Sequence, residues 1–323
     1  MGRLKVLGAV GAVALMVGAL APNSASAQEY VRAFSSLETT NLALTDADGN
    51  KLSSDFFQSF DATVTLDPRA RLRGVTDDPD TLLEFNKEGF EQLPAPVPQT
   101  TLDAFLGDGT DFDNPGMEFS RGRAQTEGNF LNRPGQDDPD ARGLTIAESQ
   151  ITDEGRGSAD SQVLTQVFDF AIAPTDQLQA GSEVEIRLTF DALLQLVTEE
   201  VGLVGISPWE ANSSFSVSAR DVTAGADVTL NELIGDIGDD LNRNVAVGGE
   251  FGPTATEHLI AGSFVVGNTH RLSLNQQVDV AARVAEDVPV DIPAPATMLL
   301  LGTGLLGLGL ASMQSVRRRR NAA

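Results

Sequence analysis

The sequence predicts an all-β fold: an antiparallel β-sandwich of jelly-roll type over residues 28–292, flanked by two terminal segments of different character. Three observations favour this class. Apolar residues recur at every second position along several stretches, as in half-buried strands. Turn-forming residues separate these stretches. Each end of the chain holds an apolar run beside basic residues, which sets the ends apart from the folded domain.

The first 27 residues have the organisation of a secretory signal peptide. Two basic residues near the start precede residues 6–21, an apolar run without a charge. Ala25 and Ala27 then place small side chains at the positions that signal peptidase recognises. We therefore expect cleavage before Gln28 and export of the remaining chain. An uncleaved N-terminal anchor is the alternative.

The strands of the domain are predicted from alternation. The longest is residues 272–284, where apolar side chains such as Leu272 and Val280 alternate with polar ones. Gly267 and Asn268 suit a tight turn between it and the preceding run, so the two should form a hairpin. Further strands are expected at residues 34–45, 63–66, 163–172, 184–190, 215–219 and 259–266.

Two other kinds of segment interrupt the pattern. Helical signals are few, and they place short helices at residues 81–90 and 230–241. Residues 91–160 are rich in proline, glycine and acidic residues. Such composition is typical of surface loops, so we expect a long polar loop region there.

The C-terminal tail, residues 293–323, has the composition of a membrane segment with a basic end. As a helix, residues 296–316 would be about 31 Å long, enough to cross a bilayer core of about 30 Å. Positive charge is retained on the cytoplasmic side, so the domain would lie outside. The predicted cytoplasmic stop consists of Arg317, Arg318, Arg319 and Arg320.

The order of features in this tail resembles the PEP-CTERM sorting domain. A short motif precedes a span rich in leucine and glycine, and an arginine cluster follows; the motif is Pro293, Ala294, Pro295, Ala296 and Thr297. The resemblance implies processing by an exosortase, a membrane-embedded cysteine protease of Gram-negative bacteria that make exopolysaccharide. The family usually has Glu where Ala294 stands, so one contact to the protease would be missing. A plain single-pass anchor is the alternative.

Composition restricts the chemistry of the domain. Residues 28–292 hold 46 acidic and 16 basic residues, an excess of 30 negative charges. This charge repels nucleic acid and anionic lipid, so neither is expected as a partner, and the membrane is expected only in transit. The chain has no cysteine, which excludes disulfides, thiol nucleophiles and cysteine-bound metals.

Two acidic segments are candidate calcium-binding loops. Residues 46–50 begin like an EF-hand loop, but Lys51 and Phe57 stand where glycine and glutamate are required, so a turn between strands is predicted. A loop can fold Asp108, Asp111 and Asp113 around a calcium ion, and a solvated loop is the alternative. No other cofactor is expected.

Catalytic signals are weak. Glu199 and Glu200 are adjacent in a predicted strand and should face opposite sides, so they do not form a glycosidase pair. No serine lies in a nucleophile elbow. His258 and His270 are the only histidines, and Trp209 is more typical of a core or loop residue than of a sugar platform.

The sequence therefore favours a non-enzymatic protein of the cell envelope or extracellular matrix. It would be cut by signal peptidase, cross the inner membrane, and be sorted by an exosortase to the cell surface, the outer envelope or the medium. A link to exopolysaccharide or biofilm follows from the resemblance. The alternatives are a carbohydrate- or calcium-binding module on the same sandwich and, with least support, a secreted hydrolase.

Overall fold

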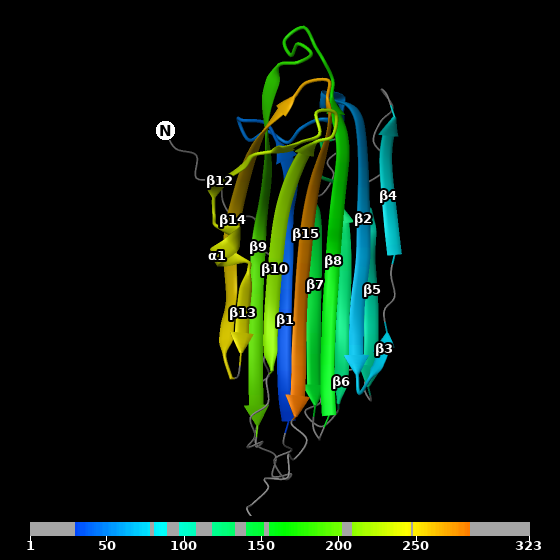
Figure 1. Cartoon of the computed structure of the whole chain (residues 1–323), viewed down its shortest axis with the longest axis vertical. Helices are drawn as coiled ribbons and strands as arrows, with labels where there is room; N and C mark the ends of the chain where they lie inside the picture. Colours follow the sequence, from blue (N-terminus) through cyan, green and yellow to red (C-terminus); the bar gives the residue numbers. More distant parts are fainter. Residues whose placement is uncertain are drawn as a thin grey trace, which may run out of the picture. The chain divides into compact units, whose positions relative to one another are not determined.

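A computed structural model describes residues 30–77, 81–88, 97–107, 118–132, 140–151, 155–201, 209–246 and 248–284. All of them belong to the first of the two units of the chain, residues 1–284. The described residues are almost entirely strands, and every pairing between the named strands is antiparallel (Figure 1). This confirms the predicted all-β, antiparallel class.

The strands form two sheets. The seven-stranded sheet has the order β12 (Leu230–Ile234), β14 (Glu250–Val265), β9 (Glu183–Val201), β1 (Tyr30–Thr45), β7 (Ala141–Ile151), β6 (Phe119–Gly128), β5 (Val97–Gly107). The eight-stranded sheet has the order β11 (Ala226–Val228), β10 (Glu210–Asp221), β15 (Thr269–Val284), β8 (Gly155–Ile172), β2 (Phe57–Leu72), β3 (Val75–Asp77), with β13 (Arg243–Ala246) beside β10 and β4 (Thr81–Glu88) beside β2.

Successive long strands repeatedly change sheet. β1 is followed by β2, β7 by β8, β8 by β9, β9 by β10, and β14 by β15, and each of these steps crosses from one sheet to the other. The more specific assignment of this sandwich to the jelly-roll type stays a prediction. Two short helical turns complete the described chain: η1 (Ser54–Phe56) and α1 (Ile237–Asp240).

The core lies between the sheets, where both contribute alternate side chains to one hydrophobic cluster. Phe190 from the seven-stranded sheet and Phe215 from the eight-stranded sheet have ring centroids 4.9 Å apart across this interface. The alternation predicted for residues 272–284 is confirmed, since Leu272, Leu274 and Val280 are buried. The other predicted strands are also confirmed. Gly267, with φ +88°, lies in the predicted turn, but β14 and β15 belong to different sheets and do not pair with each other, so the predicted hairpin was wrong.

Three predictions about irregular segments were wrong, wholly or in part. Residues 81–88 form strand β4 rather than a helix, because pairing with β2 supplies hydrogen-bond partners that local periodicity does not reveal. Residues 230–241 contain strand β12 before the single turn α1. Residues 91–160 are not one loop region, since they contain β5, β6, β7 and the start of β8. Glycines and charged residues occur in these strands, so their composition resembled that of a loop.

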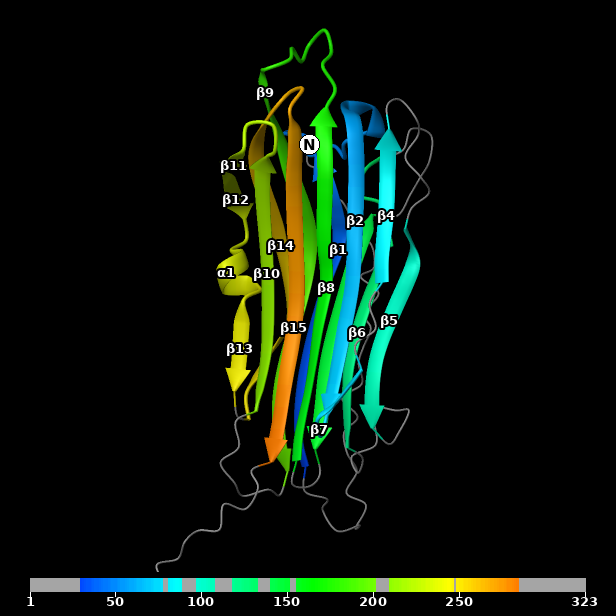
Figure 2. The same ribbon diagram turned by 45° about the vertical axis from the view of Figure 1, so that its right-hand side comes forward.

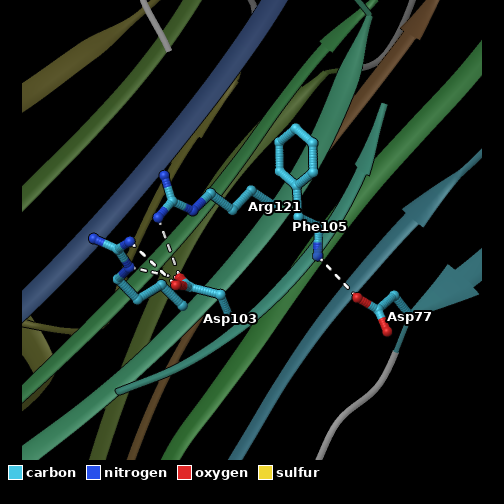
Figure 3. Close-up of polar contacts among 5 residues, drawn as sticks. Asp77, Asp103, Phe105 and Arg121 are labelled. Carbon is cyan, nitrogen blue, oxygen red and sulfur yellow. Dashed lines mark hydrogen bonds and ion pairs between the residues drawn. The ribbon is translucent and has the colours of Figure 1, made fainter. Parts of the chain in front are cut away.

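Strand β5 is the outermost strand of the seven-stranded sheet and is held from two sides. The backbone N–H of Phe105 donates to Asp77 Oδ2 at 3.0 Å, and Asp77 belongs to β3 of the other sheet (Figure 3). The carboxylate of Asp103 accepts hydrogen bonds from Arg123 Nε at 2.6 Å and from Arg121 Nη2 at 3.2 Å. These contacts fasten the strand and occupy a backbone donor on its free edge, which protects the edge from pairing with other chains.

We predict that Asp103→Asn lowers the free energy of unfolding by about 1 kcal/mol at neutral pH, a value near the upper end for partly exposed ion pairs. Burial raises the pKa of Asp103, but hydrogen bonds and charge from Arg123 and Arg121 outweigh it and hold this pKa below its usual range. The stabilisation is therefore present above about pH 4 and is lost as pH falls through the pKa of the folded state. Urea unfolding at pH 7 and at pH 3 measures both values.

Asp227→Asn is the matched control, because the Asp227 side chain is 85% exposed and its Arg220 contact is 3.4 Å long. It should change stability little at either pH. An equal loss for Asp103→Asn at both pH values would contradict the assignment to an ion pair.

A glycine turn and a buried histidine fix the corner that carries α1. The His258 side chain is 1% exposed, its ring stacks on Phe190 at 4.9 Å, and its Nε2 lies 2.9 Å from Thr256 Oγ1. Gly235 has φ +77°, and a Cβ there would overlap His258 Nδ1. Only glycine therefore lets the turn before α1 close over the imidazole ring.

We predict that His258 makes the fold sensitive to mild acid. Burial lowers the pKa of His258, although nearby acids, Asp240, Glu232, Asp191 and Asp236, oppose the shift. The unfolded chain then binds a proton below about pH 6.5 that the folded chain does not, so stability falls as pH decreases, by at most about 1.4 kcal/mol per pH unit. His258→Phe keeps an aromatic ring against Phe190 and should lose less stability between pH 7.5 and pH 5.5 in urea titrations. An identical loss in both proteins would rule out His258 as the cause.

Candidate binding site beside strand β10

Most residues singled out in the sequence lie outside the described ranges, so their roles stay predictions. They are the signal-cleavage residues Ala25, Ala27 and Gln28, the acidic residues Asp108, Asp111 and Asp113, the motif residues Pro293, Ala294, Pro295, Ala296 and Thr297, and the basic residues Arg317, Arg318, Arg319 and Arg320. The predicted membrane span, residues 296–316, lies outside them too. Within the described part of the chain, no helix has the length and apolar character needed to cross a membrane.

The described acidic residues do not form a metal centre. Among them and the two histidines, no group of three or more is arranged to hold an ion. Residues 46–50 form the predicted turn instead: Asp46 Oδ1 accepts from the backbone N–H of Asp48 at 2.9 Å and of Asn50 at 2.8 Å. Hydrogen bonds from Asn50 hold the pKa of Asp46 below its usual range.

The two histidines and the tryptophan lie in the interior. His270 is fully buried between Phe170 and Phe264, and its Nε2 lies 2.8 Å from the carbonyl oxygen of Val265. Trp209 is 2% exposed and packs in a small cluster at one end of the core, as a core residue. None of these side chains is available on a surface that a substrate reaches.

The adjacent glutamates do not form a catalytic pair. Glu199 lies opposite Arg32 in the register of β9 and β1, and Glu200 lies opposite Val31, whose side chain is buried in the core. The two carboxylates therefore belong to opposite faces of the sheet, as the alternation predicted.

The described surface is hollowed beside β10. Strand β10 pairs with β11 through residues 219–221 and with β13 through residues 210–213. β12 and α1 lie along the same side of the domain (Figure 2). A groove of about 480 Å³ opens here; its lining comes from β10, β11, β15 and Leu230 of β12: Val217, Ser218, Ala219, Arg220, Asp227, Val228, Leu230, Arg271 and Ser273.

Two arginines of the groove are direct neighbours across strands. Arg220 of β10 lies opposite Arg271 of β15, and like charges in this position repel each other. Each is flanked by an aspartate, because Asp227 of β11 lies opposite Arg220 and Asp169 of β8 lies opposite Arg271. These four side chains form a row across four strands, with the two arginines at its centre and an aspartate on either side of them.

The two arginines differ in how firmly they are held. Arg271 donates from Nε and Nη2 to both oxygens of Asp169, each at 2.8 Å, and these bonds raise the pKa of Arg271 above its ordinary value. Arg220 meets Asp227 at 3.4 Å and donates to the carbonyl oxygen of Gly225 at 3.0 Å. The side chain of Asp227 is 85% exposed, so solvent competes strongly for this second pair.

The next row supplies neutral groups. Ser218 and Ser273 lie opposite each other, one step along from the two arginines. Val217, Val228 and Leu230 are partly buried and pack against the core. On the outer face of the sheet the groove thus combines a guanidinium with a weak partner and two hydroxyls, whereas Val217 and Val228 face the core.

Sequence reasoning did not find this groove. Arg220, Asp227 and Arg271 are far from any motif, and they meet only through the register of β10 with β11 and β15. The one available signal was that residues 215–219 and 272–284 were both predicted as strands, but the sequence does not state that they pair.

Comparison with known proteins adds information about the tail. No curated protein and no solved structure gives a significant match to the chain. A family model, the PEP-CTERM protein-sorting motif, matches residues 291–320. This confirms the resemblance that the motif, the glycine-rich span and the arginine cluster had indicated. The chain therefore carries a PEP-CTERM sorting tail, the mark of proteins that are exported to the cell envelope and processed there by an exosortase-type enzyme.

Proposed function

We propose that the chain is a non-enzymatic protein of the cell surface or extracellular matrix, delivered by its tail and associated with exopolysaccharide or biofilm. The observation that carries the proposal is the sorting motif at residues 291–320. The route begins with signal peptidase cutting before Gln28. It continues through the inner membrane, where residues 296–316 pause and the arginines stay in the cytoplasm.

In this proposal the folded domain serves as a scaffold that presents its surface outside the cell. The crossing of successive long strands between the two sheets supports a jelly-roll-like scaffold for this role. The excess of 30 negative charges over residues 28–292 favours solubility outside the cell. No cofactor is required for this role, and calcium at Asp108, Asp111 and Asp113 stays a prediction.

A carbohydrate-binding module is the second candidate, and the groove beside β10 is the observation that favours it. Its hydroxyls and its guanidinium are groups that bind the hydroxyls and the acidic substituent of a sugar. A hydrolase has less support. The histidines are buried, and the two adjacent glutamates belong to opposite faces of their sheet.

We predict that residues 317–323 and the membrane span are absent from the mature protein at the cell surface. A processing enzyme needs an extended segment at the membrane, and Pro293 and Pro295 favour one because each fixes its own φ and disfavours helix in the residue before it. Pro293→Leu combined with Pro295→Leu should leave insertion intact but keep the full-length chain in the inner membrane. Mass spectrometry of C-terminal peptides in the surface and membrane fractions measures the outcome.

Pro174→Leu provides the matched control, since Pro174 is exposed in the loop between β8 and β9. This variant should reach the surface as the wild type does. Wild-type peptides that end at Ala323 in the surface fraction would show that the tail is only an anchor, and the sorting proposal would fail.

A further inference from the structure

We propose that the groove beside β10 binds the carboxylate of an acidic sugar residue, with Arg220 as the residue that recognises it. The inference deepens the carbohydrate-binding candidate described above, and it names both the ligand class and the selective group. It rests on the arrangement of the two arginines and on the hydroxyls beside them.

Arg220 is the arginine that can exchange its acidic partner, Asp227, for the carboxylate of a ligand. The Arg271 guanidinium is engaged by both oxygens of Asp169, each at 2.8 Å, so it is already satisfied. Arg220 donates to the carbonyl oxygen of Gly225 at 3.0 Å, but its acidic partner Asp227 lies 3.4 Å away and has a side chain that is 85% exposed. A ligand carboxylate can take the place of Asp227 and accept two parallel hydrogen bonds from the guanidinium, while Asp227 turns into water.

The neighbouring arginine makes this exchange favourable. Arg271 lies directly opposite Arg220, so a carboxylate on Arg220 also relieves the repulsion between the two guanidiniums. The acidic character of the whole domain opposes the approach of an anion. At physiological ionic strength, however, charges more than about 8 Å away are largely screened, so the groups within the groove decide the local interaction.

The remaining lining fits the rest of a sugar ring. The hydroxyls of Ser218 and Ser273 lie opposite each other in the row next to the arginines and can donate to or accept from sugar hydroxyls. Val217 and Val228 lie opposite the buried residues Leu274 and Ala219 and face the core, so the sugar is held through its polar groups on the outer face of the sheet. The groove volume, about 480 Å³, lies within the range of small-ligand sites.

The test is calorimetric titration of the full-length chain, purified in detergent, with trigalacturonate and with its methyl ester. The ester keeps the shape of the sugar and removes its negative charge. We expect trigalacturonate to bind at 150 mM salt and the ester to bind at least about tenfold more weakly, since a lost charge-assisted hydrogen bond of about 1.4 kcal/mol corresponds to a factor of ten.

Two substitutions should change the affinity for trigalacturonate in opposite directions, which distinguishes a loss of ligand recognition from a loss of folding. Arg220→Gln should weaken trigalacturonate binding about tenfold, whereas Asp227→Asn should strengthen it a few-fold by removing the competing carboxylate. Arg187→Gln is the matched control: Arg187 lies in the other sheet, pairs with Glu185 at 2.6 Å, and should leave affinity unchanged.

Absence of trigalacturonate binding by the wild type, equal binding of the ester, or weaker binding by Asp227→Asn would each overturn the proposal. So would unchanged affinity in a folded Arg220→Gln protein. The titration does not depend on tail processing, which is read from C-terminal peptides in cell fractions, so either hypothesis can fail without the other.

Discussion

The shared interface between the two sheets is the constraint on which the rest of the described structure depends. In one part of this interface large aromatic side chains fill the space between the sheets; they are Phe168, Phe170, Phe190, Phe215 and Phe264. Where β6 and β7 face the other sheet, the inward residues are small, and Cα atoms of β7 approach those of β8 and β15 to within 8 Å. This is closer than the spacing of about 10 Å usual between packed sheets. Small residues are therefore as necessary in this part as phenylalanines are in the other.

The narrow part of the interface also has to accommodate polar groups. Gln276 is buried on β15, and its Nε2 donates to the carbonyl oxygen of Leu37 at 2.7 Å and to Thr145 Oγ1 at 3.1 Å. Thr39 Oγ1 donates to its Oε1 at 3.2 Å. One amide thus joins three strands across both sheets, and a pairing shifted by one residue would place it against partners of the wrong kind. The network fixes register where aromatic packing is absent.

The alternation of apolar and polar residues within one strand was visible in the sequence, but the pairing between strands was not. Residues 272–284 and 184–190 were predictable because the core buries every second residue, which is a local pattern. β4 and β5 were missed because edge strands carry charge and are stabilised by neighbours distant in sequence, such as Asp77 for Phe105. The groove was missed for the same reason, since Arg220 meets Arg271 only through register. The sorting tail was predictable because its features follow one another along the chain.

The arginines show how an acidic domain uses its few basic residues. Ion pairs tie nine of them, in the described part of the chain, to acidic partners: Arg32, Arg69, Arg73, Arg121, Arg123, Arg142, Arg187, Arg220 and Arg271. Eight of the nine have a contact of 3.2 Å or less, and six of these join different segments of the chain, whereas Arg69 and Arg187 pair within their own strands. Arg220 has the longest contact and the most exposed partner. Two of the nine, Arg220 and Arg271, line the groove, and of these Arg220 has the ion pair that is weak enough to be exchanged for a ligand carboxylate.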